Sequence, residues 1–186
     1  MKKGSIMKNN IINHISLSFD AISENEAFAR MTVAFFMAQL NPTIDQVEDV
    51  KTAVSEAVTN AIIHGYEVFE DEADIQHELC THECIDKPQN HEIHETETNM
   101  KNSINNSTKK QVHMKCKYHG RELYVEISDD GVGIKDVAKA MEPLYTSKPQ
   151  LDRSGMGFSF MEAFMDELTV TSEPGHGTTV KMKKVL

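Results

Sequence analysis

Apolar and polar side chains follow strand and helix patterns in the first forty residues. Residues 11–19 place apolar side chains at alternate positions, which is typical of a strand with one buried face. From Ser23 to Leu40 apolar side chains recur at helical spacing, at Phe28, Met31, Phe35 and Met37 or Ala38. Ser23 with Glu26 predicts a capping box at the start of this helix, and Pro42 ends it.

A second, longer helix is predicted from Thr43 to Gly65. Thr43 with Gln46 repeats the capping signal, and the apolar positions that follow are Val47, Val50, Val54, Val58, Ala61 and Ile62. Three polar residues, Glu56, Asn60 and His64, lie four residues apart in its second half. Because such positions lie above one another on a helix face, they form one polar stripe, which is either solvated or holds a ligand.

The second half of the chain predicts two hairpins separated by helices. Residues 111–128 contain two alternating runs around a turn at His119-Gly120, and residues 168–185 contain a second pair around a Pro-Gly turn. Short helices are expected at 135–141 and 158–167. Strands and helices do not alternate as regular βαβ units, which favours an α+β sandwich.

The pattern is lost between these halves, at about residues 67–109. From Glu67 to Met100 the chain has eleven Asp or Glu residues and one Lys, so it has too little apolar surface to offset its ordering entropy. We expect a single domain over 1–186 with a mobile acidic insertion. The insertion contains histidines and cysteines whose spacing matches no familiar zinc module, so a solvated loop is favoured over a zinc site: His77, Cys80, His82, Cys84, His91 and His94.

Composition narrows the class of protein. With 186 residues, 39% of them apolar and 26% charged, the chain is typical of a soluble globular domain. A net charge of −10 argues against a general nucleic-acid or anionic-membrane surface, although local groups can still bind a nucleotide. No signal peptide or membrane span is evident, which predicts a cytoplasmic protein, and three cysteines make a disulfide framework unexpected.

Two segments suit the binding of a nucleotide base. Asp129 ends a predicted strand and could accept a hydrogen bond from an exocyclic amine, while Gly131 and Gly133 let the backbone approach a planar ligand. Thr178 and Thr179 offer hydroxyl groups. An ordinary Asp-Gly turn and a Thr-rich strand are the competing interpretations.

Gly155 and Gly157 precede a predicted helix and form a candidate phosphate cradle. Exposed backbone N–H groups and the helix dipole both favour an anion there. The competing interpretation is a flexible loop that enters a helix.

Four motifs in this order resemble the nucleotide-binding boxes of the Bergerat-fold (GHKL) ATPases: "SEAVTNAIIHG", "DDGVGI", "SGMGF" and "GTT". Longer stretches, "ENEAFARMTVAFFMAQL", "PLYTSKPQLDRSGMGF" and "FMDEL", resemble the anti-sigma F factors of spore-forming bacteria, a family of small serine-protein kinases. The resemblance covers almost the whole chain outside the acidic insertion. It implies a two-layer sandwich in which helices cover a mixed, mostly antiparallel sheet.

The resemblance also implies a binding site for ATP or ADP with Mg²⁺. It assigns Glu56 as the general base, Asn60 as the Mg²⁺ ligand and Asp129 as the adenine-reading carboxylate. Further nucleotide contacts are implied at Gly131, Gly133, Thr146, Arg153, Gly155, Gly157 and Thr178. A solvated surface arginine is the competing account of Arg153.

The implied partners are proteins. They are the sporulation sigma factor F, which is held inactive by a homodimer, and an anti-anti-sigma factor phosphorylated on serine, with Arg30 as a partner contact. The alternative is a nucleotide-gated anti-sigma binding protein with little kinase activity, and Glu56 favours the kinase. A histidine-kinase catalytic domain is less favoured because no phosphoacceptor helix precedes the motifs in this sequence.

Overall fold

The computed structural model describes residues 12–66, 110–145 and 155–186, which contain one five-stranded sheet. Its strands lie in the order β1-β2-β3-β5-β4, and each pairing of neighbours is antiparallel. The strands are β1 (Ile12–Asp20), β2 (Gln111–His119), β3 (Glu122–Asp129), β4 (Glu167–Ser172) and β5 (Thr178–Val185). The mostly antiparallel sheet and both hairpins expected from the sequence are confirmed.

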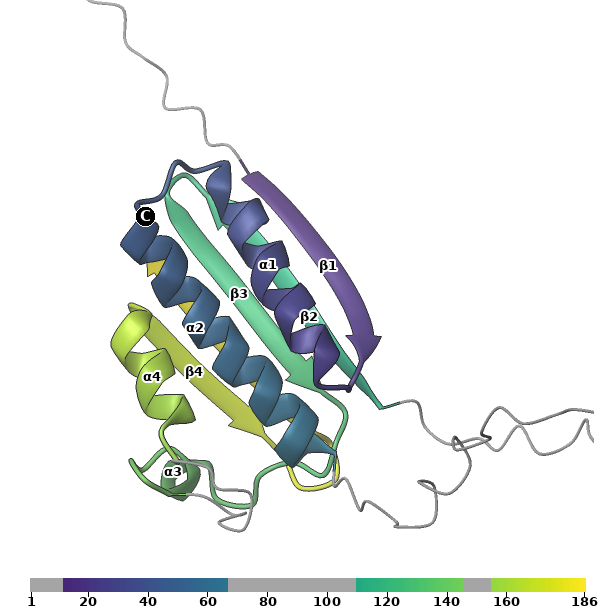
Figure 1. The fold of residues 1–186 in the computed structure, drawn as a ribbon. Coiled ribbons are helices and arrows are strands. Elements are labelled where there is room, and N and C mark those ends of the chain that lie inside the picture. The colour runs from purple at the N-terminus through teal and green to yellow at the C-terminus, as the bar shows by residue number, and fades with distance from the viewer. Residues whose placement is uncertain (1–11, 67–109, 146–154) are drawn as a thin grey trace, which may run out of the picture. The chain divides into compact units, whose positions relative to one another are not determined.

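Helices form the second layer, as Figure 1 shows. They are α1 (Glu24–Ala38), α2 (Ile44–Asn60), α3 (Val137–Ala140) and α4 (Gly157–Phe164), and a π-helical turn η1 (Ala61–Gly65) continues α2. Helices α1, α2 and α4 cover one face of the sheet. The two-layer α+β sandwich is therefore confirmed. Within the described part of the chain, no helix combines the length and apolar character that crossing a membrane requires.

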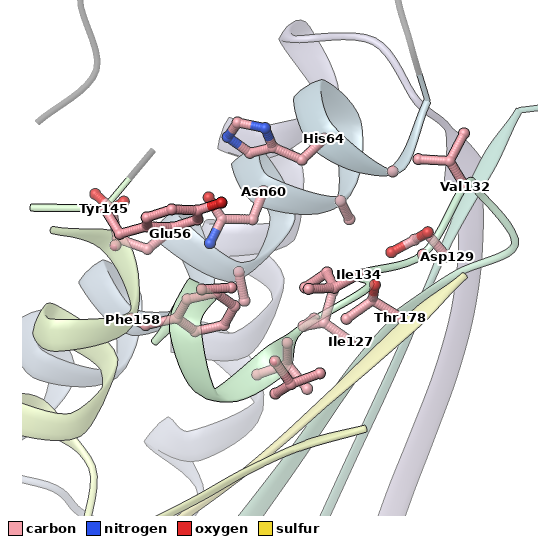
Figure 2. Close-up of a pocket in the computed structure, with 18 of the residues that line it drawn as sticks. Glu56, Asn60, His64, Ile127, Asp129, Val132, Ile134, Tyr145, Phe158 and Thr178 are labelled. Atoms are coloured by element: carbon pink, nitrogen blue, oxygen red, sulfur yellow. The ribbon is translucent and has the colours of Figure 1, made fainter. Parts of the chain in front are cut away.

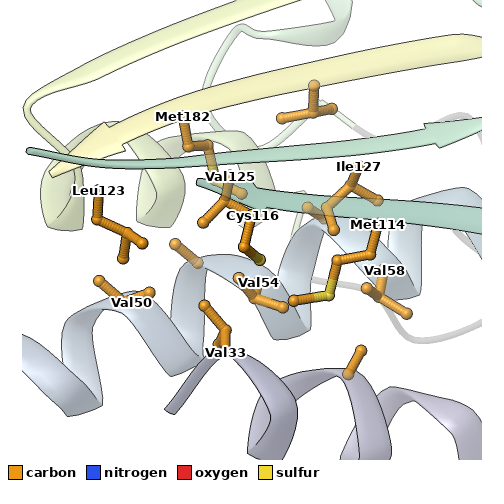
Figure 3. Close-up of a cluster of buried hydrophobic side chains, with 14 of the residues drawn as sticks. Val33, Val50, Val54, Val58, Met114, Cys116, Leu123, Val125, Ile127 and Met182 are labelled. Carbon is orange, nitrogen blue, oxygen red and sulfur yellow. The ribbon is translucent and has the colours of Figure 1, made fainter. Parts of the chain in front are cut away.

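The core lies between the two layers (Figure 3). Alternate residues of β2 and β3 point toward the helices and are buried, as expected for strands that bury one face. The largest fully buried side chains include Val33, Val50, Val54, Val58, Met114, Leu123, Val125 and Ile127. Cys116 is also buried here as a free thiol, and burial raises its pKa to about 12.

The two predicted capping boxes have different outcomes. At α2 the box is present: Gln46 N donates to Thr43 Oγ1 (3.2 Å), and Thr43 N donates to Gln46 Oε1 (2.9 Å). At α1 the prediction is wrong. Ser23 has helical dihedral angles (φ −59°, ψ −32°) and its side chain makes no capping hydrogen bond, because an N-cap needs extended backbone to reach the next turn.

Helix α1 also buries a different face from the one that its larger apolar residues suggest. Phe28, Met31 and Phe35 are 59%, 47% and 72% exposed. The core side of α1 is instead formed by Ala29, Val33, Phe36 and Met37. Helical spacing therefore predicted the helix correctly, but the helix carries two apolar faces, and only one of them meets the sheet.

One helix differs from the sequence prediction in the type of its last turn, and another differs in its end. The second predicted helix does reach Gly65, but its last turn is π-helical. The last helix ends at Phe164 rather than at residue 167, because the N–H of Asp166 already donates to Lys183 O on β5 (2.9 Å). The acidic insertion predicted at 67–109 lies outside the described residues.

Candidate functional site

A cavity of about 1110 Å³ lies beside the C-terminal half of α2, between η1, α3 and the start of α4 (Figure 2). Seven of the predicted site residues line it: Glu56, Asn60, Asp129, Gly133, Gly155, Gly157 and Thr178. In the sequence these residues are spread over a span of more than 120 positions. The antiparallel order of the strands places the end of β3 beside the start of β5, which brings Asp129 opposite Thr178 in the pairing register.

The polar stripe of the second helix faces this cavity. Glu56, Asn60 and His64 all line it, and Figure 2 shows their side chains along one wall. The start of α4 stands against this wall. A Cβ atom at Gly157 would lie 3.0 Å from Glu56 Oε2 and 3.2 Å from Asn60 Nδ2, so a residue with a side chain would displace these groups.

Asp129 is the buried carboxylate of the site. It is 5% exposed and sits at the end of β3, where its Oδ1 accepts a hydrogen bond from the N–H of Gly131 (2.9 Å). Burial raises its pKa above the usual aspartate value, while the backbone N–H groups of Gly131 and Thr178 partly offset this effect. A buried acceptor that borders a cavity is suited to a ligand with an N–H donor, because pairing reduces the cost of desolvation.

Glycines near Asp129 allow backbone segments to touch. A Cβ atom at Gly131 would lie 1.9 Å from Gly65 O, and one at Gly177 (φ +79°) would lie 1.9 Å from Asp129 O. Gly133 (φ +71°) lines the cavity. Gly131 does not belong to the described residues that line the cavity. The structure thus places Gly131 against η1, and Gly133 next to the space for a ligand.

The glycines at the start of α4, Gly155 and Gly157, also border the cavity, as the sequence predicts. Gly155 has φ +66°, and its carbonyl accepts a hydrogen bond from the N–H of Leu144 (3.0 Å). The chain therefore enters and leaves segment 146–154 at one place beside the cavity. Thr146 and Arg153, the two remaining nucleotide contacts implied by the sequence, lie outside the described residues.

The cavity includes residues that were not predicted as site residues. Lys135, Lys139 and Tyr145 line it, and Lys139 Nζ lies 5.3 Å from the centre of the Tyr145 ring. The apolar part of the cavity wall includes Ile127, Ile134, Phe158 and Val180. Lys135 lies just before the short helix α3 and Lys139 lies within it. Lysines at such positions are ordinarily solvated, so only the fold shows that two cations border the same space as Asn60.

The other predicted groups lie elsewhere. Arg30 is on α1 and does not line the cavity; its Nε lies 3.6 Å from Glu26 Oε1, and its side chain is 41% exposed. Among the described residues, no three His, Cys, Asp or Glu side chains are placed to hold a metal ion. The histidines and cysteines of the insertion are outside this part of the chain.

Comparison with known proteins agrees with this geometry. The family model for the histidine kinase-like ATPase domain matches residues 19–184, a range that includes every described residue of the cavity wall. The anti-sigma F factor of Clostridium botulinum is 47% identical over 173 residues, which are 92% of this chain and 94% of that protein. The chain belongs to the anti-sigma F factor family.

Other members of this family are similar over the same length. The anti-sigma F factor of Shouchella clausii is 45% identical and that of Bacillus velezensis is 41% identical, each over 174 residues that cover 94% of this chain and 93% of the relative. The ATPase domain of the family binds ATP and ADP. The cavity fits an adenine nucleotide, because it combines a buried acceptor, an apolar wall and glycines at a helix start.

Proposed function

We propose that this protein is an anti-sigma factor and a protein serine kinase. It binds and inhibits sigma factor F, and it uses ATP to phosphorylate a serine of the anti-anti-sigma factor, which inactivates that protein. The observation that carries the proposal is that Glu56 and Asn60 lie together on the wall of the cavity, next to the start of α4. The site is expected to work in the cytoplasm, where a sigma factor directs transcription.

ATP is proposed to lie along the cavity from Asp129 toward α4. Asp129 accepts a hydrogen bond from the exocyclic amine of adenine, and Ile127 and Ile134 pack against the base. The phosphates reach Gly155 and Gly157, where backbone N–H groups and the helix dipole favour negative charge. Thr146 and Arg153 are proposed to complete the phosphate contacts.

Mg²⁺ is proposed to bind through the carboxamide oxygen of Asn60. An amide oxygen is a hard ligand, as Mg²⁺ requires. The ion would neutralise charge on the phosphates during transfer. Asn60 would then hold the nucleotide in line with the acceptor.

Glu56 is proposed as the general base. The serine oxygen attacks the γ-phosphorus, its bond to that phosphorus forms, and the bond from the γ-phosphorus to the β–γ bridging oxygen breaks to release ADP. The serine proton passes to the Glu56 carboxylate. Glu56 lies one helical turn before Asn60, so the base and the metal ligand face the same reacting group.

Protein partners are proposed to meet helix α1. Arg30 is exposed on the flank that carries Glu26, whereas Phe28, Met31 and Phe35 are exposed elsewhere on α1. The neighbouring β1 is an edge strand of the sheet. We assign the exposed apolar residues of α1 and strand β1 to the interface of the homodimer. We assign Arg30 to the contacts with the sigma and anti-anti-sigma factors.

Sedimentation velocity tests the proposed dimer. A protein that remains a monomer at every concentration would contradict it.

The decisive experiment separates the chemical step from binding. Glu56→Gln keeps the size of the side chain but cannot accept the serine proton, so phosphate transfer to the anti-anti-sigma factor should fall about 10²–10⁴-fold. ATP affinity and capture of sigma factor F should stay within a few-fold of the parent. The matched control is Glu48→Gln, which changes an exposed glutamate of the same helix that pairs with Lys51 (2.7 Å).

The outcomes distinguish the kinase from the alternative function. Parental transfer by Glu56→Gln would show that Glu56 is not the base. If the parent captures the sigma factor with ADP or ATP but transfers no phosphate, the protein is a nucleotide-gated binder without kinase activity. If the Glu48→Gln control also loses transfer, the assay reports general damage to α2.

A further inference from the structure

Tyr66 occupies a position that the proposed chemistry does not use. It follows η1 directly and is 9% exposed. Its hydroxyl donates to Gln111 O, and it accepts from the N–H groups of Gln111 (3.1 Å) and Asp130 (3.1 Å). A phenol has one donor and can accept twice, so this hydroxyl is fully used by backbone groups.

These hydrogen bonds connect three segments at one end of the cavity. Gln111 starts β2, Asp130 directly follows β3, and Tyr66 directly follows η1. A second link lies alongside, because the N–H of Val132 donates to Gly65 O (2.8 Å). Residues 65–66 and 130–132 are therefore held together as a pair of adjacent backbone segments.

The same pair of segments encloses the carboxylate of Asp129. A Cβ atom at Gly65 would lie 2.7 Å from Asp129 Oδ1, so the η1 backbone packs directly on this group. On the other side, the N–H of Gly131 donates to Oδ1 (2.9 Å). The orientation of the carboxylate thus depends on the distance between the η1 end and the turn after β3, and the Tyr66 hydroxyl helps to fix that distance.

The phenol is kept protonated in this setting. Burial raises the pKa of Tyr66, and the nearby carboxylates of Asp129 and Asp130 raise it further, against the lowering effect of the backbone hydrogen bonds. The hydroxyl therefore remains a donor to Gln111 at neutral pH.

We propose that Tyr66 is a positioning residue for adenine recognition. Its hydroxyl holds the turn of residues 130–132 against η1, so that the Asp129 carboxylate stays aimed at the exocyclic amine of the base. This inference rests on the proposed role of Asp129 in binding adenine. Tyr66 contacts no ligand itself; it acts through Asp130 and the turn.

The test compares ATP with inosine triphosphate, which has a carbonyl oxygen in place of the exocyclic amine. Tyr66→Phe should lower ATP affinity about five- to tenfold, the equivalent of about one hydrogen bond, and should change affinity for inosine triphosphate less. The ratio of the two affinities should therefore fall. Isothermal titration calorimetry measures both values.

A matched control removes a hydroxyl of similar burial from another place. Tyr118 is 4% exposed and its hydroxyl lies 3.2 Å from Gln39 Oε1, away from the cavity. Tyr118→Phe should keep the parental affinity ratio even if it lowers thermal stability. A merely structural role for Tyr66 would make the two variants alike.

The unmodified protein provides a second measurement, which does not depend on the folding of a variant. Coupling between two sites is reciprocal. If the hydrogen bond from the Asp130 N–H to the Tyr66 hydroxyl supports recognition of the amine, binding of the amine should in turn stabilise that hydrogen bond. At equal saturation, ATP should therefore slow hydrogen exchange of the Asp130 amide more than inosine triphosphate does. Equal protection by both nucleotides would contradict the inference.

The outcomes separate the two proposals. If the parent does not prefer ATP to inosine triphosphate, the role of Asp129 in the proposed function fails. If the parent prefers ATP and Tyr66→Phe keeps the same ratio, only the role of Tyr66 fails. A reduced ratio in Tyr66→Phe with an unchanged ratio in Tyr118→Phe supports both.

Discussion

Asp129 and Glu56 are two carboxylates that line one cavity, and they differ in how deeply they are buried. Asp129 is enclosed by η1 and the turn after β3, whereas Glu56 is half-buried on the polar stripe of α2. A buried carboxylate that keeps its position is suited to recognition, and a more accessible one is suited to exchanging a proton with an acceptor. The same side-chain chemistry can therefore serve two roles in one site.

The raised pKa of Asp129 predicts a cost in stability at neutral pH. When burial raises a carboxyl pKa above its unfolded value, the contribution to stability is complete below the unfolded pKa and is lost as pH rises through the folded pKa. Asp129→Asn should therefore be at least as stable as the parent at pH 7 without nucleotide, and this advantage should shrink as the pH falls toward the usual aspartate range. Thermal unfolding across pH measures it.

The same substitution should weaken ATP binding, because the amide is a weaker acceptor than the charged carboxylate. Stability and function would then change in opposite directions. If Asp129→Asn is less stable than the parent at pH 7, and less stable by the same amount in acid, then Asp129 contributes packing rather than a desolvated charge.

At the scale of elements, helix α2 carries both the core and the chemistry. Its buried face includes Val50, Val54 and Val58, and its polar stripe includes Glu56 and Asn60. The π-turn that continues α2 ends with Gly65 close enough to the β3 turn for its carbonyl to accept from Val132. Element α2 therefore connects the proposed phosphate end of the cavity with the adenine end.

The two helix starts give a direct comparison of capping. Thr43→Ala should lower the free energy of unfolding by about 1 kcal/mol, because it removes the side-chain acceptor of a complete capping box. Ser23→Ala should change it by less than about 0.5 kcal/mol, because Ser23 makes no capping hydrogen bond. Urea denaturation measures both, and equal losses would contradict the difference between the two sites.

At the scale of the whole molecule, the described residues that flank the acidic insertion are in contact. The chain leaves the described fold at Tyr66 and returns at Lys110, and the Tyr66 hydroxyl is hydrogen-bonded to both backbone groups of Gln111. We therefore continue to propose a single domain with an insertion, in which residues 67–109 connect two points that are already close.

Replacing residues 67–109 with a Gly-Ser linker of about six residues should preserve the fold, since each residue spans up to about 3.3 Å. ATP affinity and the midpoint of thermal unfolding should stay close to those of the parent, because the acidic composition of that segment leaves it little apolar surface to pack. Calorimetry and thermal unfolding of the two proteins test this. A large fall in the unfolding midpoint would show that the insertion contributes to the core.

Many residues of the site could be predicted, because patterns over a few residues of sequence indicate them. Spacing by four placed Glu56, Asn60 and His64 on one face. The strand ending at Asp129 and the glycines at the start of α4 were evident from residue types. Lys135 and Lys139 were not predicted as site residues, because two lysines spaced by four at a short helix are ordinarily solvated. Their place at the cavity depends on where α3 packs, and this is a tertiary property.

By itself the sequence determined the succession of helices and strands, the two hairpins and the capping box at Thr43, because periodicity, turn residues and side-chain caps act over a few residues. Only the tertiary structure decided which apolar face of α1 is buried, since Phe28 and Phe35 are as apolar as Phe36 and the choice depends on the fit to the sheet. It also decided the role of Tyr66, whose hydrogen-bond partners lie 45 and 64 residues away, because contacts at such separations leave no periodic signal in a sequence.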